Sequence, residues 1–410
     1  MKRVVITGCG VVSPLGSDID TFWQNIQASK SGISKLADDE LIGVKSRVAG
    51  KVIGYNEAHY FEGNNAKKCD LFVQYGIAAA DQAIKNSGIS LHEVENNPFR
   101  YGVAIGAGIG GLDSIEKNYQ KAMSLGARKI SPHFVPATII NMVAGNVSMR
   151  HGFQGPNISV VTACASGTHN IGMAAQMIAA GQADVMLAGG AEYSSVMLAM
   201  GGFASMKALS TNPDPQTASR PFDIDRDGFV LSDGAGVVVL EEYEKALQRN
   251  APIIAEIAGF GMTSDAHHVT QPAADGLGAI MAMQSALNSA GCDLSDIGYV
   301  NAHGTSTYHD KTEANAIAEL FNDHSKSLLV SSTKSMLGHQ LGAAGATEAI
   351  ICALSLQQQV VPASINCVNQ DPEIKLNIIK NCMQDHSYNY AVSNSFGFGG
   401  TNAALVIAKI

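Results

Sequence analysis

The sequence predicts an α/β protein with two similar halves. Short runs of β-branched residues alternate with helical patterns, which indicates helices layered on a largely parallel sheet. The pattern starts again near Asn250-Ala251-Pro252, so we expect an N-terminal half at residues 1–250 and a C-terminal half at residues 251–410. The expected strands, about five in each half, are Arg3–Thr7, Gly102–Ile105, Ile158–Thr162, Ala183–Leu187, Gly236–Glu241, Ile253–Gly259, Ile297–Ala302, Ser327–Ser331, Tyr390–Ser393 and Ala403–Ile407.

One strand-to-helix unit in each half supports this duplication. Ile158–Thr162 leads through Cys164 and small neighbours into a helical pattern, and Leu328–Ser331 leads through a loop into a pattern with the same offsets. Such units are common in α/β proteins, so chance correspondence is the alternative that the pattern leaves open. Three segments, at residues 25–65, 110–150 and 200–230, match neither period well. We expect them to be loops or caps over one face of the sheets.

Composition and charge exclude several classes of protein. The net charge of −9 argues against bulk affinity for nucleic acid or an anionic membrane. The seven cysteines include no Cys-x-x-Cys pair, so neither a disulfide framework nor a zinc knuckle is indicated. The chain has no apolar run of about 18 residues, and its opening residues are expected to form a strand rather than a signal peptide. We therefore expect a cytoplasmic protein.

Cys164 is the candidate nucleophile. It lies after a predicted strand and before a predicted helix, where the helix dipole is expected to favour the thiolate and lower the pKa of the thiol. Small neighbours permit a tight turn and the close approach of a substrate carbonyl. A thiolate is well suited to take an acyl group from another thioester, because the exchange is nearly balanced in energy. A buried structural cysteine is the alternative.

Two histidines follow strands of the C-terminal half. His303 lies in Asn301-Ala-His-Gly-Thr-Ser-Thr307, and His339 ends a loop that also contains Lys334. Loops at the carboxyl ends of strands are where open α/β sheets bind ligands. A metal site is weakly supported, because no histidines are four residues apart on a helix and the adjacent His267 and His268 cannot easily share one ion.

Four segments together resemble the signature segments of the type II β-ketoacyl-acyl-carrier-protein synthases. Their order and spacing fit that family, and the similarity extends over essentially the whole chain. The segments are Thr162-Ala-Cys-Ala-Ser-Gly167, Asn301-Ala-His-Gly-Thr-Ser-Thr307, Lys334-Ser-Met-Leu-Gly-His339 and Asn394-Ser-Phe-Gly-Phe-Gly-Gly-Thr-Asn402. The resemblance implies a duplicated thiolase-like fold, with two βα halves in a layered α-β-α-β-α core. It also implies fatty acid elongation by an acyltransferase.

The resemblance implies a role for each catalytic candidate. Cys164 would carry the growing acyl chain, while His303 and His339 promote decarboxylation of malonyl-carrier protein. Neutral imidazoles suit this step, because one must donate a hydrogen bond to the thioester oxygen as an enolate develops. Lys334 would either pair with Glu348 or tune the histidines electrostatically. The backbone N–H groups of Cys164 and Phe398 would hold the oxyanion.

Further residues are implied to bind the substrates. Phe398 would gate the acyl pocket and Ile109 would line it, although core packing and turn hydrogen bonds are the alternative roles for such residues. Thr270, Thr305 and Thr307 would contact the phosphopantetheine arm, which arrives on the carrier protein, so that no cofactor or metal is expected. A homodimer is implied by the family only. An acidic acyl carrier protein would dock on Lys67, Lys68, Arg128, Lys129 and Lys207.

One departure from the family lies beside His303. After Thr307 the family usually has proline and a loop that is one residue longer, whereas this chain reads Tyr308-His309-Asp310. Tyr308 is expected to affect fine selectivity there rather than the class of reaction. Ala165, where threonine is more common, is a milder change.

The residues also leave rival interpretations. Gly106-Ala-Gly-Ile-Gly-Gly111 satisfies the G-x-G-x-x-G pattern of dinucleotide-dependent oxidoreductases, but the acidic residue expected about 20 residues later is missing. A non-catalytic partner of a condensing enzyme would not need Cys164 and both histidines. A thiolase would use a second cysteine as base, where this chain has Phe396 and Phe398. A polyketide ketosynthase stays open from the residues alone.

Overall fold

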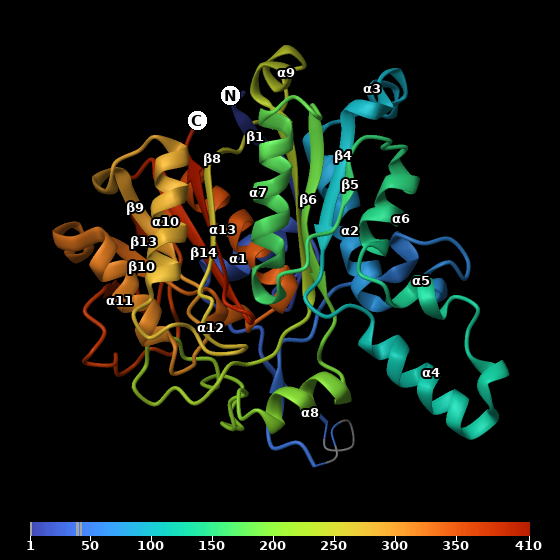
Figure 1. Cartoon of the computed structure of the whole chain (residues 1–410), viewed down its shortest axis with the longest axis horizontal. Coiled ribbons are helices and arrows are strands. Elements are labelled where there is room, and N and C mark those ends of the chain that lie inside the picture. The colour runs from blue at the N-terminus through green and yellow to red at the C-terminus, as the bar shows by residue number, and fades with distance from the viewer. Residues whose placement is uncertain (1, 38–40, 42) are drawn as a thin grey trace.

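The structure is a computed structural model that describes residues 2–37, 41 and 43–410. Within these residues one sheet of 11 strands runs through the molecule (Figure 1). The first half contributes β1 (Val4–Val12), β4 (Tyr101–Gly106), β5 (Asn157–Ile158), β6 (Val185–Glu192) and β7 (Gly234–Glu242). The second half contributes β8 (Ala255–Ser264), β9 (Ile297–Asn301), β10 (Leu329–Ser331), β12 (Asn377–Ile378), β14 (Tyr390–Gly397) and β15 (Thr401–Ala408).

The two halves have the same sheet topology, which confirms the duplication. From the centre outward the first half runs β1-β7-β6-β4-β5 and the second runs β8-β15-β14-β9-β10. Numbered along its own chain segment, and leaving out the additional edge strand β12 of the second half, each half therefore has the order 1-5-4-2-3. The relative directions of neighbouring strands also agree between the halves. Among these five strands, the two inner pairings of each half are antiparallel and the two outer pairings are parallel. A short antiparallel contact of β1 with β8 joins the halves.

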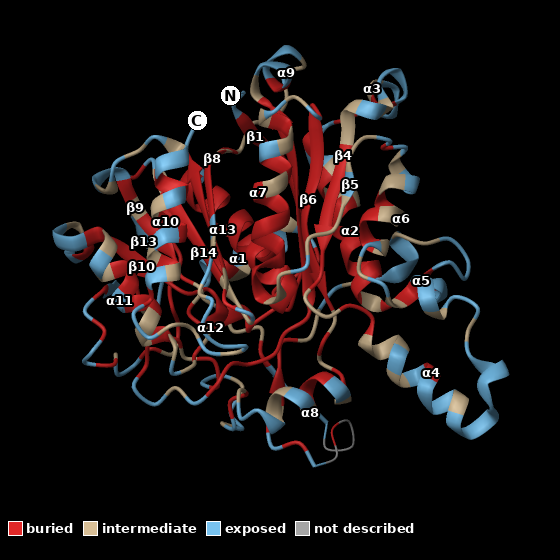
Figure 2. Cartoon of the chain, in the orientation of Figure 1, coloured by how far each residue is buried: buried red, intermediate tan, exposed pale blue. Residues whose placement is uncertain are grey.

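Helices form three layers around the two halves of the sheet. The central layer contains α7 (Ser166–Ala179) and α13 (Ala344–Gln358), which pack against each other and against strands of both halves. Outside the first half lie α2 (Leu71–Ser87) and α6 (Met142–His151), and outside the second lie α10 (Leu277–Ala290) and α11 (Asp310–Phe321). This is the expected layered α-β-α-β-α core. Figure 2 shows buried residues concentrated in the sheet and the central helices, whereas the outer helices expose one face.

The remaining elements surround this core. No helix of the described residues is long and apolar enough to cross a membrane. The other helices are α1 (Ile19–Gln27), α3 (Leu91–Asn96), α4 (Leu112–Leu125), α5 (Phe134–Thr138), α8 (Met197–Ser205), α9 (Tyr243–Gln248) and α12 (Lys334–Leu337). Two small ribbons pair β2 (Ser34–Lys35) with β3 (Val48–Ala49) and β11 (Val360–Val361) with β13 (Gln384–Asp385).

Two local expectations are wrong. The segment at residues 110–150 is largely helical, because it contains α4, α5 and α6; the apolar residues Ile115, Tyr119 and Met123 of α4 recur every four residues, which is a helical period. The strand expected over Ile158–Thr162 pairs only at its start, with β4, and β5 is the outermost strand of this half, with no pairing on its far side among the described residues. Residues 38–40 and 42, within the expected segment 25–65, lie outside the described residues.

Candidate active site

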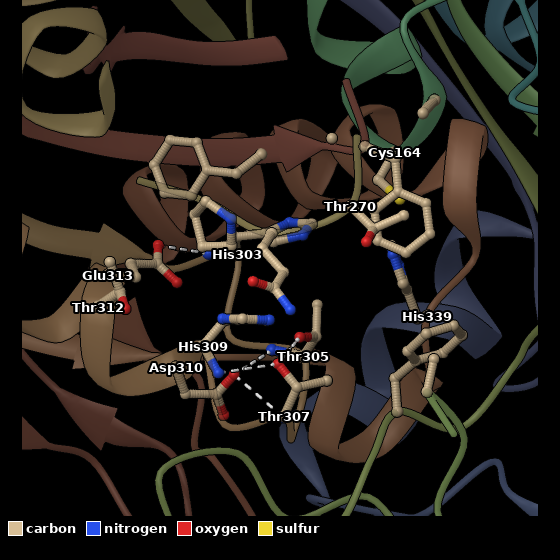
Figure 3. Close-up of a pocket in the computed structure, with 18 of the residues that line it drawn as sticks. Cys164, Thr270, His303, Thr305, Thr307, His309, Asp310, Thr312, Glu313 and His339 are labelled. Carbon is tan, nitrogen blue, oxygen red and sulfur yellow. Dashed lines mark hydrogen bonds between the residues drawn. The ribbon is translucent and has the colours of Figure 1, made fainter. Parts of the chain in front are cut away.

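A cavity of about 580 Å³ opens where the two halves meet. Cys164, His303 and His339 all line it, so the structure brings together the three residues on which the sequence argument depends (Figure 3). Cys164 comes from the N-terminus of α7 in the first half. The two histidines follow β9 and β10, which are parallel neighbours in the second half, so their carboxyl ends reach the same edge of the sheet.

Cys164 is held in a strained turn at the start of the central helix. It is the middle residue of the 3₁₀ turn Ala163–Ala165, which leads directly into α7. Ala163 has a φ of +50°, a conformation that costs a non-glycine residue free energy and is often found at functional sites. The corresponding turn of the second half, Leu341–Ala343 before α13, begins with the same feature at Leu341, whose φ is +46°.

The pKa of the Cys164 thiol is raised, not lowered. Cys164 is only 8% exposed, and burial raises its pKa to about 12. The Lys334 cation and the backbone N–H groups of Phe398 and of Cys164 itself act in the opposite direction. The expectation from the helix dipole is thus wrong, because desolvation of the thiolate outweighs the favourable dipoles. The thiol must lose its proton during acyl transfer.

Both imidazoles are neutral and share the cavity. Their ring centroids are 5.3 Å apart with the planes nearly perpendicular, and Phe229 packs edge-on against His339 at 5.3 Å. Burial and the nearby Lys334 cation hold the pKa of each histidine well below its ordinary value. A neutral imidazole can both accept a proton and donate a hydrogen bond. The Nδ1 atoms of His303 and His339 are buried without a hydrogen-bond partner in the described residues.

Lys334 forms a buried ion pair with Glu348, and its charge also acts on the two histidines. Its ammonium group donates to Glu348 Oε1, and the two side chains are 2% and 3% exposed. Burial raises the pKa of Glu348 to about 7, while Lys334 acts to lower it. The same cation lowers the pKa values of Cys164, His303 and His339. One buried charge therefore favours the thiolate and keeps both imidazoles neutral.

Phe398 follows β14 in a glycine-rich turn above Cys164. A Cβ atom on Gly397 would lie 2.6 Å from the carbonyl oxygen of Thr162, so only glycine lets this turn approach the nucleophile. The next two residues, Gly399 and Gly400, have positive φ values, and the N–H of Gly399 donates to the carbonyl of Val269. The Phe398 side chain is half-buried and lies against Phe203 at the cavity wall. Its backbone N–H faces the sulfur, as an oxyanion donor requires.

The predicted substrate-binding residues also line the cavity. Ile109 packs with the apolar cluster that contains Cys164, Leu341 and Phe229. Thr270, Thr305 and Thr307 line the same cavity, and the hydroxyls of Thr305 and Thr307 are 3.0 Å apart.

The shortened loop after Thr307 is fixed by one buried carboxylate. Asp310 accepts hydrogen bonds from the backbone N–H groups of Thr305, Ser306, Thr307 and Phe222. Tyr308 is 74% exposed at the cavity rim, whereas His309 is half-buried and lines the cavity. Tyr308 and His309, where the sequence was expected to depart from the family, thus face the cavity.

The five basic residues proposed for docking are exposed but do not form one cluster in a single chain. Lys207 lines the mouth of the cavity. Lys67 and Lys68 lie in a turn before α2, near the start of α4, where Ser114 N–H donates to Asp70. Arg128 and Lys129 lie beyond the far end of α4. A helix of 14 residues is about 21 Å long, so α4 separates these two basic groups.

A buried acid that no sequence motif indicated shapes the loop of His303. Glu313 in the first turn of α11 accepts hydrogen bonds from the N–H groups of His303 at 2.8 Å and Gly304 at 2.7 Å. Burial raises the pKa of Glu313 to about 7. The available signal was an acidic residue ten positions after His303.

The dinucleotide interpretation fails on geometry. The N–H groups of Gly108, Ile109 and Gly110, which would hold a pyrophosphate, donate to the carboxylate of Glu192. Elsewhere, within residues 2–37, 41 and 43–410, no three His, Cys, Asp or Glu side chains are grouped so that they could hold a metal ion.

Comparison with known proteins decides the family. The model of the beta-ketoacyl synthase N-terminal domain matches residues 1–246, and that of the C-terminal domain matches residues 254–368. The chain belongs to the beta-ketoacyl synthase family. Two relatives of this family, both named 3-oxoacyl-acyl-carrier-protein synthase 2, are 50% identical in Vibrio cholerae and 48% identical in Coxiella burnetii. Each alignment covers 100% of this chain and 99% of the relative.

Solved beta-ketoacyl synthases have the same fold. A beta-ketoacyl synthase from Burkholderia phymatum superposes with a TM-score of 0.92 at 34% identity, covering 100% of both chains. A type II polyketide ketosynthase structure, solved as an acyl-carrier protein in complex with its ketosynthase, superposes with a TM-score of 0.91 at 32% identity. That match covers 100% of this chain and 99% of the other.

Proposed function

We propose that this enzyme elongates fatty acyl chains by a decarboxylative condensation. Cys164 takes the acyl group from one carrier protein, and malonyl-carrier protein then supplies two carbons to give a 3-oxoacyl thioester. The observation that carries this proposal is the meeting of one thiol and two neutral imidazoles in a single cavity beneath a backbone oxyanion donor. Both thioester arms arrive on the carrier protein, so the enzyme needs no cofactor of its own.

Acyl transfer uses the groups around the sulfur. The Cys164 thiol gives its proton to a neutral imidazole as its sulfur attacks the incoming thioester carbonyl. The negative charge that develops on the carbonyl oxygen is stabilised by the N–H groups of Cys164 and Phe398. Collapse of the tetrahedral intermediate breaks the old carbon–sulfur bond, and the proton leaves with the thiol of the carrier protein.

Condensation uses the two histidines. Their N–H groups donate to the malonyl thioester oxygen, so that loss of CO₂ leaves a stabilised enolate. The enolate carbon attacks the acyl carbonyl on Cys164, and the same two backbone N–H groups hold the second oxyanion. The bond to Cys164 then breaks and the thiolate recovers a proton. His303 and His339 must stay neutral for this step, which the Lys334 charge favours.

The substrates are proposed to occupy opposite ends of the cavity. The acyl chain lies against Ile109 and the apolar cluster around it, with Phe398 at the gate. The phosphopantetheine arm passes Thr270, Thr305 and Thr307 on the way to Cys164.

The partner is proposed to be an acidic acyl carrier protein. Lys207 at the cavity mouth, with Lys67, Lys68, Arg128 and Lys129, supplies positive charge on a chain with a net charge of −9. Positive charge at these separate positions would steer an acidic partner without promoting non-specific binding. Lys207→Glu should raise the KM for carrier-bound substrates and make this KM less dependent on salt, with kcat little changed. An unchanged KM at low salt would contradict this docking site.

A homodimer is proposed from the free edge of the first half. β5 is the outermost strand there, and large apolar side chains are exposed at Val161, shortly after this strand, and at Met149 of α6, which contacts β5. Tyr119 and Met123 of α4 are exposed as well. An exposed apolar surface beside an unpaired strand edge favours pairing with a second copy. Light scattering should give the mass of two chains, and Val161→Arg should give one. A monomeric wild type at micromolar concentration would contradict the proposal.

The reaction is tested with acyl- and malonyl-carrier proteins of graded chain length, with the products read by mass spectrometry. Wild-type enzyme should give 3-oxoacyl products two carbons longer. Cys164→Gln should give none, yet still release CO₂ from malonyl-carrier protein through the histidines. Condensation by the Cys164→Gln variant would refute the assignment of Cys164 as the nucleophile. Serial extension without reduction between cycles would instead indicate a polyketide enzyme.

A further inference from the structure

A buried carboxylate connects the two halves beside the nucleophile. Glu192, the last residue of β6, is fully buried. Its Oε2 accepts the N–H groups of Gly108 at 2.7 Å and Gly342 at 3.0 Å, and its Oε1 accepts those of Ile109 at 3.2 Å and Gly110 at 3.3 Å. Three of these donors lie in the loop after β4 of the first half. The fourth lies in the turn before α13 of the second half.

Both connected segments form walls of the cavity. Ile109 and Leu341 line it together with Cys164, and the three pack in one apolar cluster. The loop and the turn are in close contact, because a Cβ atom on Gly342 would lie 2.1 Å from the backbone nitrogen of Gly108. The position of Ile109 relative to Cys164 is therefore set by the carboxylate between the two segments.

A glutamate is the side chain that this geometry requires. Four N–H donors converge on two oxygens, and each oxygen accepts two of them. A glutamine has one amide oxygen and one NH₂ group, so two of the four donors would face another donor. An aspartate keeps both oxygens but is shorter by one methylene and cannot reach both segments at once.

We propose that Glu192 is a positioning residue that sets the acyl chain lengths accepted by Cys164, by holding the loop of Ile109 against the turn of Leu341. The carboxylate touches neither substrate nor the reacting sulfur in this role. Its charge also raises the pKa of Cys164, but this affects short and long acyl substrates alike and so does not change their ratio. Glu192 acts through Ile109, whose side chain limits the depth of the pocket. This proposal rests on the proposed function, which supplies the acyl substrate. It depends only on the first step of the proposed reaction, the acylation of Cys164.

The test measures acylation of Cys164 by short and long acyl thioesters, read as the intact mass of the full-length protein. Glu192→Gln leaves two buried donors without an acceptor, so the ratio of long-chain to short-chain acylation rates should change by about tenfold. Glu192→Asp should change the ratio in the same way and provides a second variant if the glutamine variant does not fold. Unchanged ratios in the folded variants would overturn the proposal.

A matched control separates positioning from general destabilisation. Asp223 is also a buried carboxylate that accepts backbone N–H groups, from Asp225 and Asn369, but it does not line the cavity. Asp223→Asn should lower the denaturation midpoint and leave the acylation ratio unchanged. A ratio that shifts equally in Asp223→Asn would mean that Glu192 acts only through stability, and would overturn the proposal.

A double variant tests the route through Ile109. Ile109→Ala removes the side chain that the loop positions, so Glu192→Gln should have no further effect on the ratio in that background. A full effect of Glu192→Gln without the Ile109 side chain would overturn this route. Failure of this proposal can be told apart from failure of the proposed function. If Cys164 is acylated with this chain-length selectivity but the enzyme does not condense malonyl-carrier protein, only the proposed condensation is refuted.

Discussion

Replacement of Lys334 by methionine tests the electrostatic account of the site most directly. The substitution keeps an unbranched side chain of similar length and removes the cation. Glu348 is 3% exposed and would keep a buried carboxylate with no partner. Breaking a buried ion pair from one side costs about 3–5 kcal/mol, and we expect a loss of this size in the free energy of unfolding, measured with urea at pH 8, where the wild-type Glu348 is ionised. In the variant the pKa of Glu348 rises further because Lys334 no longer lowers it, so part of the loss is the cost of protonating this carboxyl group.

The same substitution should change the reactivity of Cys164. The Lys334 cation lowers the pKa of the thiol and of both histidines. Without it the thiolate forms at higher pH, so the pH profile of alkylation by iodoacetamide should move to higher pH. Condensation should fall because less thiolate is present and the imidazoles protonate more readily.

Two controls make the result decisive. Lys326 pairs with Asp323 on the surface, where both side chains are more than three-quarters exposed, and such pairs contribute about 0–1 kcal/mol. Lys326→Met should therefore change neither stability nor alkylation appreciably. Lys334→Met combined with Glu348→Gln should recover most of the lost stability but not the alkylation profile. Wild-type stability and an unshifted profile in Lys334→Met would refute the reasoning.

Further outcomes follow from the same geometry. His303→Ala and His339→Ala should each slow CO₂ release from malonyl-carrier protein by about 10²–10³-fold, with Cys164 still open to alkylation; near-wild-type release would contradict their role. Ile109→Phe should shorten the products found by mass spectrometry, and an unchanged distribution would place the acyl chain elsewhere. Burial raises the pKa values of Glu192 and Glu313 from near 4.5 to about 7 in the folded state. Their contribution to stability is therefore present below pH 4.5 and is lost as the pH rises through about 7, by up to about 3 kcal/mol for each group. In urea unfolding between pH 5 and 8, the stability of the wild type relative to Glu313→Gln should fall as the pH rises, because the buried histidines, whose lowered pKa values act in the opposite direction, are common to both proteins; equal slopes would contradict the prediction.

Much of the fold and site could be predicted because the signals are local. A β-branched run followed by small residues and a helical pattern indicates a strand, a turn and a helix, so the strand-to-helix unit around Cys164 could be predicted from the sequence. The strand-end positions of His303 and His339 follow from the same rule. The short pairing of β5 could not be predicted from the sequence, since it depends on which strand lies at the edge of the sheet. The helix α4 was missed although its apolar residues have a helical period.

The sequence by itself determined the order of the elements and identified the three candidate reactive residues, because these depend on neighbours along the chain and on motifs. The matching strand order of the two halves decided the duplication, which the sequence pattern had left open. Only the tertiary structure decided the protonation states. The pKa of Cys164 rises to about 12 although its turn begins a helix, since burial removes the water that would stabilise a thiolate. The role of Glu192 was likewise decided by folding. Its four N–H donors come from segments more than 200 residues apart in the chain, and only packing of the two halves brings them to one carboxylate.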